Sequence, residues 1–386
     1  YVGVNDRNKH RFEGMWPLPY GVSYNSYLID DEMVALVDTV DICYFEVYLR
    51  KIKQVIGERP INYLIINHME PDHSGSIRLI KQHYPGIIIV GNKQTFGMIE
   101  GFYGVTGEQY LVKEGDFLAL GHHKLRFYMT PMVHWPETMM TFDETDGVLF
   151  SGDGFGCFGT VDGGFLDTRI NVDKYWGEMV RYYSNIVGKY GSPVQKALQK
   201  LGGLPISAIC STHGPVWTEN IAKVIGIYDR LSRYDADEGV VIAYGSMYGN
   251  TEQMAEAIAE ELSAQGVKNI VMHNVTKSHP SYIIADIFRY KGLIIGSPTY
   301  SNQIFPEVEA LLSKILLREV KGRYLGYFGS FTWAGAAVKR LAEFAEKSKF
   351  ELVGDPVEMK QAMKDLTYTQ CENLARAMAD RLKKDR

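Results

Sequence analysis

The part of the chain after Tyr234 alternates between short apolar segments and amphipathic helical segments. Such alternation predicts a parallel sheet with helices on both faces, because parallel strands need long crossover connections. The expected strands are Val240–Tyr244, Ile270–His273, Gly292–Ile295 and Tyr324–Phe328, and the expected helices are Glu252–Ala264, Val308–Leu317 and Ala336–Lys347. This part is therefore expected to be a doubly wound α/β domain.

The residues before Tyr234 indicate a different arrangement. Short β-rich stretches there are followed by Gly, Pro or His rather than by helix signals, which favours a sandwich of sheets with exposed loops. The expected strands are Tyr24–Ile29, Met33–Val37, Tyr63–Asn67, Gly86–Val90, Leu125–Met129, Gly147–Phe150 and Ala208–Cys210, and the expected helices are Phe45–Ile56, Ser76–His83, Val172–Val187 and Val194–Leu201. The polar stretch Asp235–Gly239 is the expected linker. A chain of 386 residues suits two domains, here 1–236 and 239–386.

Composition excludes several classes of protein. The longest apolar runs, such as Ile87–Val90, are strand-sized, far below the ~18 residues of a membrane span. A net charge of −5 with scattered basic residues gives no expectation of nucleic-acid binding. The four cysteines are far apart and form no C-x-x-C pair, so we expect neither a disulfide framework nor a fused zinc ribbon. The start at Tyr1 shows no signal-peptide pattern, and a cytoplasmic protein is expected.

The strongest chemical signal is the segment His68-Met-Glu70-Pro-Asp72-His73. It follows an apolar strand, so four donor side chains are expected on one loop at the carboxyl end of that strand. Pro71 stiffens the loop and lowers the entropy lost on gathering the donors. Imidazole and carboxylate groups at this density predict a metal site.

One loop cannot surround two metals, and further donors follow other expected strands. His134 lies in His-Trp-Pro-Glu-Thr-Met, Asp153 closes the strand that contains Val148–Ser151, and His213 precedes Gly214. The expected set is four histidines and three carboxylates. The other histidines are interpreted as surface or core residues: His10, His83, His122, His123, His273 and His279.

A phosphate-binding loop is predicted in the second domain, directly after the strand Val240–Tyr244. Hydroxyl and amide side chains, a flexible glycine and the free N–H groups of a helix start can cradle a phosphate dianion. The residues are Ser246, Met247, Tyr248, Gly249, Asn250 and Thr251. The loop has no lysine, unlike a Walker loop, which argues against a nucleoside triphosphate with magnesium.

Two more loops follow neighbouring strands and are expected to hold a flat ring system at the same edge of the sheet. Each offers backbone N–H groups, small residues and an aromatic side chain. The first comprises Ser297, Pro298, Thr299, Tyr300, Ser301 and Asn302, and the second comprises Ser330, Phe331, Thr332, Trp333, Ala334 and Gly335. The phosphate loop resembles the phosphate site of flavodoxins, which holds a monophosphate, so the resemblance of the three loops implies FMN.

The segment Gly154-Phe-Gly156-Cys-Phe-Gly159 matches the G-x-G-x-x-G pattern of dinucleotide-binding folds. The residues that follow it, Thr-Val-Asp-Gly-Gly, do not continue as a helix, and Asp153 beside it is a predicted metal ligand. We therefore interpret it as a close-packed loop beside the metals.

The pattern His-x-[His/Glu]-x-Asp-His with later His, Asp and His resembles the metallo-β-lactamase fold in the form carried by flavodiiron proteins. The strings Tyr24-Asn-Ser-Tyr27 and Tyr182-Tyr-Ser-Asn-Ile186 and the three flavin loops are also similar to that family, so the resemblance covers nearly the whole chain. It implies an N-terminal αββα sandwich and a C-terminal flavodoxin-like domain.

The resemblance also implies the metal and its ligands. It assigns His68, Glu70 and His134 to one iron, Asp72, His73 and His213 to the other, and Asp153 to a bridging position. Zinc hydrolases of this fold usually have a histidine where this chain has Glu70, and a carboxylate is a harder ligand that suits iron. Three carboxylates carry a charge of −3 and two ferrous ions a charge of +4, so one bridging hydroxide would bring the net charge of the site near zero.

The activity implied by the resemblance is reduction of O₂ to water, of NO to N₂O, or both, with electrons passing from FMN to the iron pair. A head-to-tail homodimer, or a dimer of such dimers, is expected to bring the flavin of one subunit to the metals of the other. The electron donor is expected to be a separate carrier: rubredoxin, a reduced deazaflavin or a flavin reductase. Two alternatives are a zinc-dependent hydrolase fused to a flavodoxin domain and a non-catalytic electron carrier.

Overall fold

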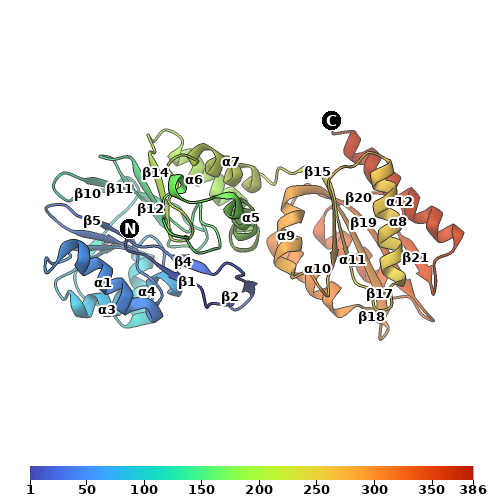
Figure 1. Ribbon diagram of the computed structural model, residues 1–386, viewed down its shortest axis with the longest axis horizontal. Helices are drawn as coiled ribbons and strands as arrows, with labels where there is room; N and C mark the ends of the chain where they lie inside the picture. The colour runs from blue at the N-terminus through green and yellow to red at the C-terminus, as the bar shows by residue number, and fades with distance from the viewer. Residues whose placement is uncertain (386) are drawn as a thin grey trace. The chain divides into compact units, whose positions relative to one another are not determined.

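The computed structural model describes residues 1–385 and divides the chain into two compact units, Tyr1–Ser232 and Arg233–Arg386. Figure 1 shows the elements of each unit. Within residues 1–385, no helix has both the length and the apolar composition that crossing a bilayer requires.

The first unit contains two five-stranded sheets. One has the order β5 (Tyr27–Ile29), β6 (Ala35–Val37), β7 (Tyr63–Ile65), β8 (Ile88–Gly91) and β9 (Gln109–Leu111). The other has the order β10 (Phe117–Ala119), β11 (Lys124–Met129), β12 (Met139–Asp143), β13 (Val148–Gly152) and β14 (Ala208–Ser211). Two small hairpin-like pairs join β1 (Val4–Asp6) to β4 (Val22–Tyr24) and β2 (Arg11–Phe12) to β3 (Trp16–Pro17).

The two large sheets face each other across a shared core. Val37 and Ile65 of the first sheet belong to the same buried cluster as Leu125, Phe127 and Phe150 of the second. Helices cover the unit on either side of the sheets (Figure 1): α1 (Phe45–Ile56), α3 (Ile77–His83) and α4 (Lys93–Tyr103), and α5 (Asp173–Tyr182), α6 (Gly191–Leu201) and α7 (Ile221–Ser232). Short helical turns are η1 (Ile42–Tyr44), α2 (Pro71–Ser74), η2 (Asp167–Arg169), η3 (Tyr183–Val187) and η4 (Gly188–Tyr190). The predicted αββα sandwich is confirmed.

Two predicted elements of this unit were wrong in detail. The single strand expected at Tyr24–Ile29 is two strands, β4 and β5, in different sheets, because the Asn25 side chain between them donates to the carbonyls of Ser211 and Gly214. The helix expected at Val172–Val187 ends at Tyr182 and continues as a π-helical turn. There the Asn185 side chain donates to the Arg181 carbonyl and competes with the α-helical hydrogen bonds.

The second unit is built on a parallel sheet of order β16 (Ile270–Asn274), β15 (Asp237–Tyr244), β17 (Tyr290–Tyr300), β19 (Tyr324–Phe331) and β20 (Glu351–Leu352). Next to it, β21 (Val357–Lys360) continues the parallel pairing with β19, and β18 (Gln303–Ile304) forms a short antiparallel pair with β17. Figure 1 shows α8 (Asn250–Ala264) and α12 (Asp365–Lys383) on one side of the sheet and α9 (Pro280–Arg289) and α10 (Pro306–Arg318) on the other; α11 (Ala337–Ser348) completes the unit. The predicted doubly wound, flavodoxin-like sheet is confirmed, with the strand order typical of that fold.

Several boundaries of the second unit differ from the prediction. Strand β15 begins at Asp237, inside the expected linker, because Asp237 already pairs with Tyr290 of β17. Strand β17 extends to Tyr300, since Thr299 and Tyr300 pair with β18 across a tight turn at Ser301 and Asn302. Both turn residues have positive φ, as this kind of hairpin requires.

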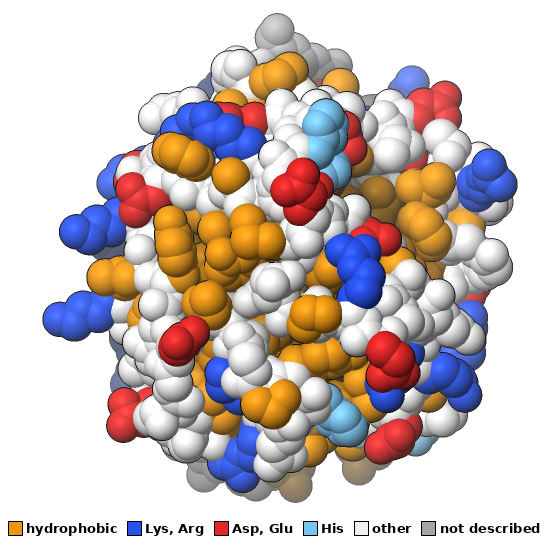
Figure 2. Space-filling model, turned by 90° about the vertical axis from the view of Figure 1, so that its left-hand side faces the viewer, with side chains coloured by type: hydrophobic (Ala, Val, Ile, Leu, Met, Phe, Trp, Pro, Cys, Tyr) orange, Lys and Arg blue, Asp and Glu red, His pale blue; other side chains and the backbone are white. Residues whose placement is uncertain are grey.

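Charges of both signs are interspersed over the face of the molecule shown in Figure 2. Hydrophobic side chains lie between them. That face therefore has no extended patch of a single charge sign.

Candidate functional site

The seven predicted metal ligands come together in the first unit, on segments that follow strands of both sheets. His68 and Glu70 lie in the loop after β7, whereas Asp72 and His73 lie in the one-turn helix α2. The expected single loop is thus half helical, because Pro71 occupies the first helical position, where its fixed φ is favourable. The three remaining ligands follow strands of the second sheet: His134 after β11, Asp153 after β13 and His213 after β14.

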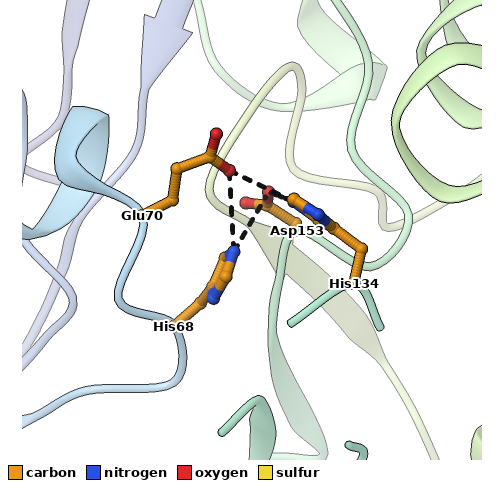
Figure 3. A group of neighbouring side chains, drawn as sticks. All are labelled: His68, Glu70, His134 and Asp153. Atoms are coloured by element: carbon orange, nitrogen blue, oxygen red, sulfur yellow. Dashed lines mark hydrogen bonds and ion pairs between the residues drawn. The ribbon is translucent and has the colours of Figure 1, made fainter. Parts of the chain in front are cut away.

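Four of these side chains form a first group, which Figure 3 shows converging from three segments. The Nε2 atom of His134 lies 3.1 Å from Glu70 Oε2 and 3.1 Å from Asp153 Oδ2. The Nε2 atom of His68 lies 3.6 Å from the same oxygen of Glu70 and 3.8 Å from the same oxygen of Asp153. Metal bonds of about 2.0–2.2 Å place neighbouring ligand atoms roughly 3.0–3.5 Å apart. The spacing of the group therefore fits one cation.

The second group consists of Asp72, His73 and His213. The Nε2 atom of His73 lies 3.5 Å from Asp72 Oδ1, and that of His213 lies 3.3 Å from Asp72 Oδ2. Asp153 joins the two groups, because its other oxygen, Oδ1, lies 3.1 Å from His73 Nε2 and 3.6 Å from His213 Nε2. One carboxylate thus presents one oxygen to each group.

Several atoms at the centre of the two groups are buried and make no hydrogen bond within residues 1–385. They are His68 Nε2, both carboxylate oxygens of Asp72, both ring nitrogens of His73 and His213 Nε2. Leaving a buried polar atom unpaired costs about 1–3 kcal/mol. A pair of cations satisfies all of these atoms except Nδ1 of His73, and the mixture of imidazole and carboxylate ligands suits iron.

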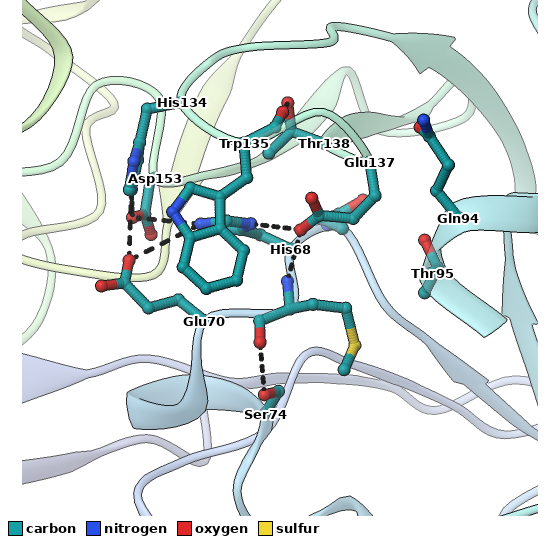
Figure 4. A network of polar contacts seen from close by, with 12 residues as sticks. His68, Glu70, Ser74, Gln94, Thr95, His134, Trp135, Glu137, Thr138 and Asp153 are labelled. Carbon is teal, nitrogen blue, oxygen red and sulfur yellow. Dashed lines mark hydrogen bonds and ion pairs between the residues drawn. The ribbon is translucent and has the colours of Figure 1, made fainter. Parts of the chain in front are cut away.

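A second layer of hydrogen bonds holds the ligands in place. Figure 4 shows the contact between His68 and Glu137, in which His68 Nδ1 lies 2.7 Å from Glu137 Oε1. The His213 Nδ1 atom lies 2.8 Å from the Ser23 carbonyl oxygen. The Thr212 hydroxyl donates to Asp153 Oδ1. Such contacts leave Nε2 of each imidazole as the free ligand atom. Glu137 was not predicted, although it follows the ligand His134 by only three positions.

The electrostatics of the cluster favour bound positive charge. Burial lowers the pKa of His73 and of His134, but the surrounding carboxylates outweigh it and raise both pKa values to about 10. Burial opposes ionisation of Glu70, yet its contacts with His134 and His68 lower its pKa to about 2. The pKa of Asp153 is held well below its usual range against the effect of burial, chiefly by the charge of His73. Protons or metal ions can supply the positive charge that these carboxylates require.

A third group of acids and histidine lies elsewhere in the unit, at His123, Asp143 and Asp146. The Asp143 carboxylate is already satisfied, because it contacts His123 Nδ1 at 2.8 Å and accepts a hydrogen bond from the backbone N–H of Thr145. Asp146 is exposed. The carboxylates of this group are therefore already stabilised without a bound cation.

The second unit has a cavity of about 350 Å³ at the carboxyl ends of β15, β17 and β19. Residues of all three predicted flavin loops line it: Ser246, Met247, Tyr248, Asn250, Thr251, Pro298, Thr299, Tyr300, Ser301, Ser330, Phe331, Thr332 and Trp333, together with Gln361. Tyr248 and Trp333 are 90% and 79% exposed, which is unusual for large aromatic side chains and suits stacking on a flat ring.

The cradle at the start of α8 fits a phosphate group. Gly249 has a φ of +89° and leaves open space around its Cα, so the N–H groups at the helix start are accessible to an anion. The hydroxyls of Thr251 and Ser330 lie 2.8 Å apart and connect the first loop to the third. The flavodoxin-like sheet, the aromatic side chains and this cradle together fit FMN.

Five predicted flavin residues do not line the cavity: Gly249, Ser297, Asn302, Ala334 and Gly335. Ser297 lies inside β17, and its hydroxyl is occupied by the Pro298 carbonyl and the Phe305 N–H. Gln361, which sequence reasoning missed, follows β21 and is brought to the cavity by the pairing of that strand with β19.

The segment Gly154–Gly159 is a turn beside the metal groups, not a helix start. A side chain at Gly156 would lie 3.1 Å from the Asp153 carbonyl oxygen and 3.6 Å from His213. Its interpretation as a close-packed loop is confirmed.

Known proteins match both units. A family model described as "ODP family beta lactamase" matches residues 22–214, and a flavodoxin model matches residues 242–373. The anaerobic nitric oxide reductase flavorubredoxin of Vibrio vulnificus is 32% identical over 357 residues, which are 91% of this chain and 72% of the relative.

Solved structures extend the similarity to the whole chain. Rubredoxin oxygen:oxidoreductase from Desulfovibrio gigas superposes with a TM-score of 0.95 at 31% identity, covering 99% of this chain and 96% of the other. The flavodiiron protein from Giardia intestinalis gives a TM-score of 0.92 at 26% identity, covering 100% and 96%. The fold and the two sites define a metallo-β-lactamase-like domain joined to a flavodoxin domain. The chain belongs to the flavodiiron proteins.

Proposed function

We propose that this protein reduces O₂ to water, NO to N₂O, or both, using FMN and a pair of iron ions. The observation that carries the proposal is the bridging position of Asp153, whose two oxygens face two separate groups of donors. The names of the flavorubredoxin relative and of the Desulfovibrio structure support the two substrates. Glu70 argues against the zinc hydrolase considered above, because it provides a hard oxygen ligand.

In this proposal His68, Glu70 and His134 hold one iron, Asp72, His73 and His213 hold the other, and Asp153 bridges them. When bound, the flavin and the iron pair supply two electrons each. Reduction of O₂ to two waters consumes four electrons and four protons, and reduction of two NO to N₂O and water consumes two of each. The buried donor set keeps bulk water away from the ligands, and the Thr212 hydroxyl fixes the orientation of the bridging carboxylate.

The flavin is assigned to the cavity at the start of α8. Ser246, Asn250 and Thr251 would bind the phosphate, while Tyr248 and Trp333 would stack on the ring system. The domain division at 1–236 and 239–386 stays a prediction. We also place the protein in the cytoplasm, because the four cysteines are unpaired thiols.

The reaction is tested by stopped-flow reoxidation of the fully reduced protein. Rapid oxidation by O₂ with water as the product, or by NO with N₂O as the product, is the expected result. Absence of reaction with both gases, or peroxide as the main product, would refute the proposal.

We further propose a head-to-tail homodimer, or a dimer of such dimers, and a separate electron donor such as rubredoxin, a reduced deazaflavin or a flavin reductase. Electron transfer requires the flavin and the metals to lie close together, and the family resemblance implies that a head-to-tail dimer brings the flavin of one subunit to the metals of the other. Sedimentation of the active protein tests it, and a fully active monomer would refute it.

Loading of the metal is expected to release protons. With pKa values of about 10, His73 and His134 carry protons at pH 7 in the metal-free protein, whereas a metal binds only the neutral imidazole. Addition of ferrous ion to metal-free protein in a weakly buffered anaerobic solution should therefore release up to two protons from these imidazoles. Metal affinity should increase with pH up to about 10. Metal uptake without proton release at pH 7 would show that these histidines are not ligands.

A further inference from the structure

Glu137 is a buried carboxylate that contacts a proposed iron ligand without being a ligand itself. It lies between β11 and β12, on the same short segment as His134, and is 0% exposed. Its backbone carbonyl accepts a 2.6 Å hydrogen bond from the side chain of Asn92, which also caps the start of α4. The segment that carries Glu137 is therefore fixed to the rest of the unit.

One oxygen of Glu137 accepts two hydrogen bonds, as Figure 4 shows. Oε1 lies 2.7 Å from His68 Nδ1 and 2.9 Å from the backbone nitrogen of Met69. Two N–H groups on one oxygen favour the ionised carboxylate. Because Nδ1 of His68 donates to Glu137, its Nε2 keeps the free lone pair and faces Glu70 and Asp153.

In the described part of the chain, no carboxylate is hydrogen-bonded to the Nδ1 atom of a histidine in the second metal group. His213 Nδ1 is paired with a neutral carbonyl oxygen, that of Ser23, and His73 Nδ1 has no hydrogen bond within residues 1–385. The two metal groups have the same number of ligand carboxylates. Glu70 belongs to the first group, Asp72 to the second, and Asp153 is shared by both. Asp38 is a buried carboxylate near His73, but its oxygens accept from the backbone N–H and the side chain of Asn67. Among the described residues, Glu137 is thus the carboxylate hydrogen-bonded to the outer ring nitrogen of a ligand histidine, and that histidine belongs to the first group.

A negative charge in a buried site stabilises the more positive state of a nearby metal. On the basis of the proposed di-iron function, we propose that Glu137 is a positioning residue that makes the two metal positions unequal. It orients His68 and gives the iron at the His68–Glu70–His134 position the lower reduction potential. With two iron ions bound, Glu137 would favour the ferric state of the iron held by His68, Glu70 and His134. An external one-electron reductant would then reduce the iron held by Asp72, His73 and His213 first.

The test uses Glu137→Gln, which keeps an oxygen acceptor and the size of the side chain but removes the charge. A matched control is Glu13→Gln. Glu13 is close enough for the charges of Glu70 and His134 to affect it, yet its carboxylate accepts from the Trp16 indole at 2.8 Å and contacts no ligand histidine. Both variants and the wild type are studied as the iron- and flavin-loaded full chain.

The readout is an anaerobic reductive titration followed by electron paramagnetic resonance and Mössbauer spectroscopy. We expect Glu137→Gln to raise the lower of the two iron reduction potentials by at least about 59 mV. For one electron, this shift equals a tenfold change in the ferric-to-ferrous ratio at a fixed potential. Chelator dialysis should also remove one iron per chain from this variant roughly 10–100 times more readily. The Glu13→Gln control should show a smaller shift and wild-type retention of both irons.

Potentials that do not change in Glu137→Gln would overturn the inference, as would an equal shift in Glu13→Gln or equally easy loss of both irons. If Glu137→Gln does not fold, the same titration is made on Glu137→Asp, whose carboxylate is one methylene shorter and should give a smaller shift in the same direction; no shift there overturns the inference. A wild-type protein that holds no iron would contradict the proposed function itself, so the two failures are distinguishable.

Discussion

Asp153→Asn is expected to lower the affinity for both metals by more than about 100-fold and to reduce gas-reducing activity in proportion. The side chain is 1% exposed, and one of its oxygens faces each donor group. The amide keeps the shape of the carboxylate but removes its charge and one acceptor oxygen. A change at this one residue should therefore affect two metals, whereas loss of His68 or His213 should affect mainly one. Metal analysis after dialysis against a chelator provides the measurement.

Asp143→Asn is the matched control for this change. Asp143 is also buried, at 3% exposure, and also contacts a histidine, but it lies in the third acidic group, which needs no cation. This variant should keep both metals and its activity. If Asp153→Asn retained metal as well as the control does, the bridging assignment would be wrong.

Asn250→Asp is expected to weaken FMN binding on the order of 100-fold, because it places a negative charge beside the phosphate dianion. Asn250 is the first residue of α8 and lines the flavin cavity. An acidic residue in the first turn of a helix is favourable, so the variant should fold normally. Fluorescence titration of the flavin-free protein gives the dissociation constants.

Two comparisons separate the effect of the added charge on FMN binding from a general disruption of the flavin site. Riboflavin lacks the phosphate, so its affinity should be the same in Asn250→Asp and in the wild type. Gln253→Glu makes the same change of charge one turn later on an exposed position of α8 and should leave FMN binding nearly unchanged. If Asn250→Asp lowered the affinities for riboflavin and for FMN equally, the phosphate would not lie beside Asn250.

The metal ligands could be predicted from the sequence because all seven were expected in segments that directly follow a strand. His68, His134 and His213 are distant in the chain, yet the facing sheets bring their loops together. The role of Glu137 could not be predicted in the same way. Its contact with His68 depends on the conformation of the segment after His134. The hydrophobic pattern of the flanking strands does not predict that conformation.

The fold was predictable where hydrophobic patterns are long and regular, as in β15 and β19. It was less predictable where side chains compete with backbone hydrogen bonds. Asn25 separates β4 from β5, and Asn185 ends the regular part of α5. Gln361 reaches the flavin cavity through strand pairing between β21 and β19, which is a long-range contact that local pattern does not encode.

The most direct test of the central claim is to count metal and flavin in protein purified without added metal. The proposed site predicts about two iron ions and one FMN per chain, because seven donors form two groups joined by Asp153 and one flavin cavity is present in the second unit. Two zinc ions with no flavin, or no tightly bound metal, would contradict it.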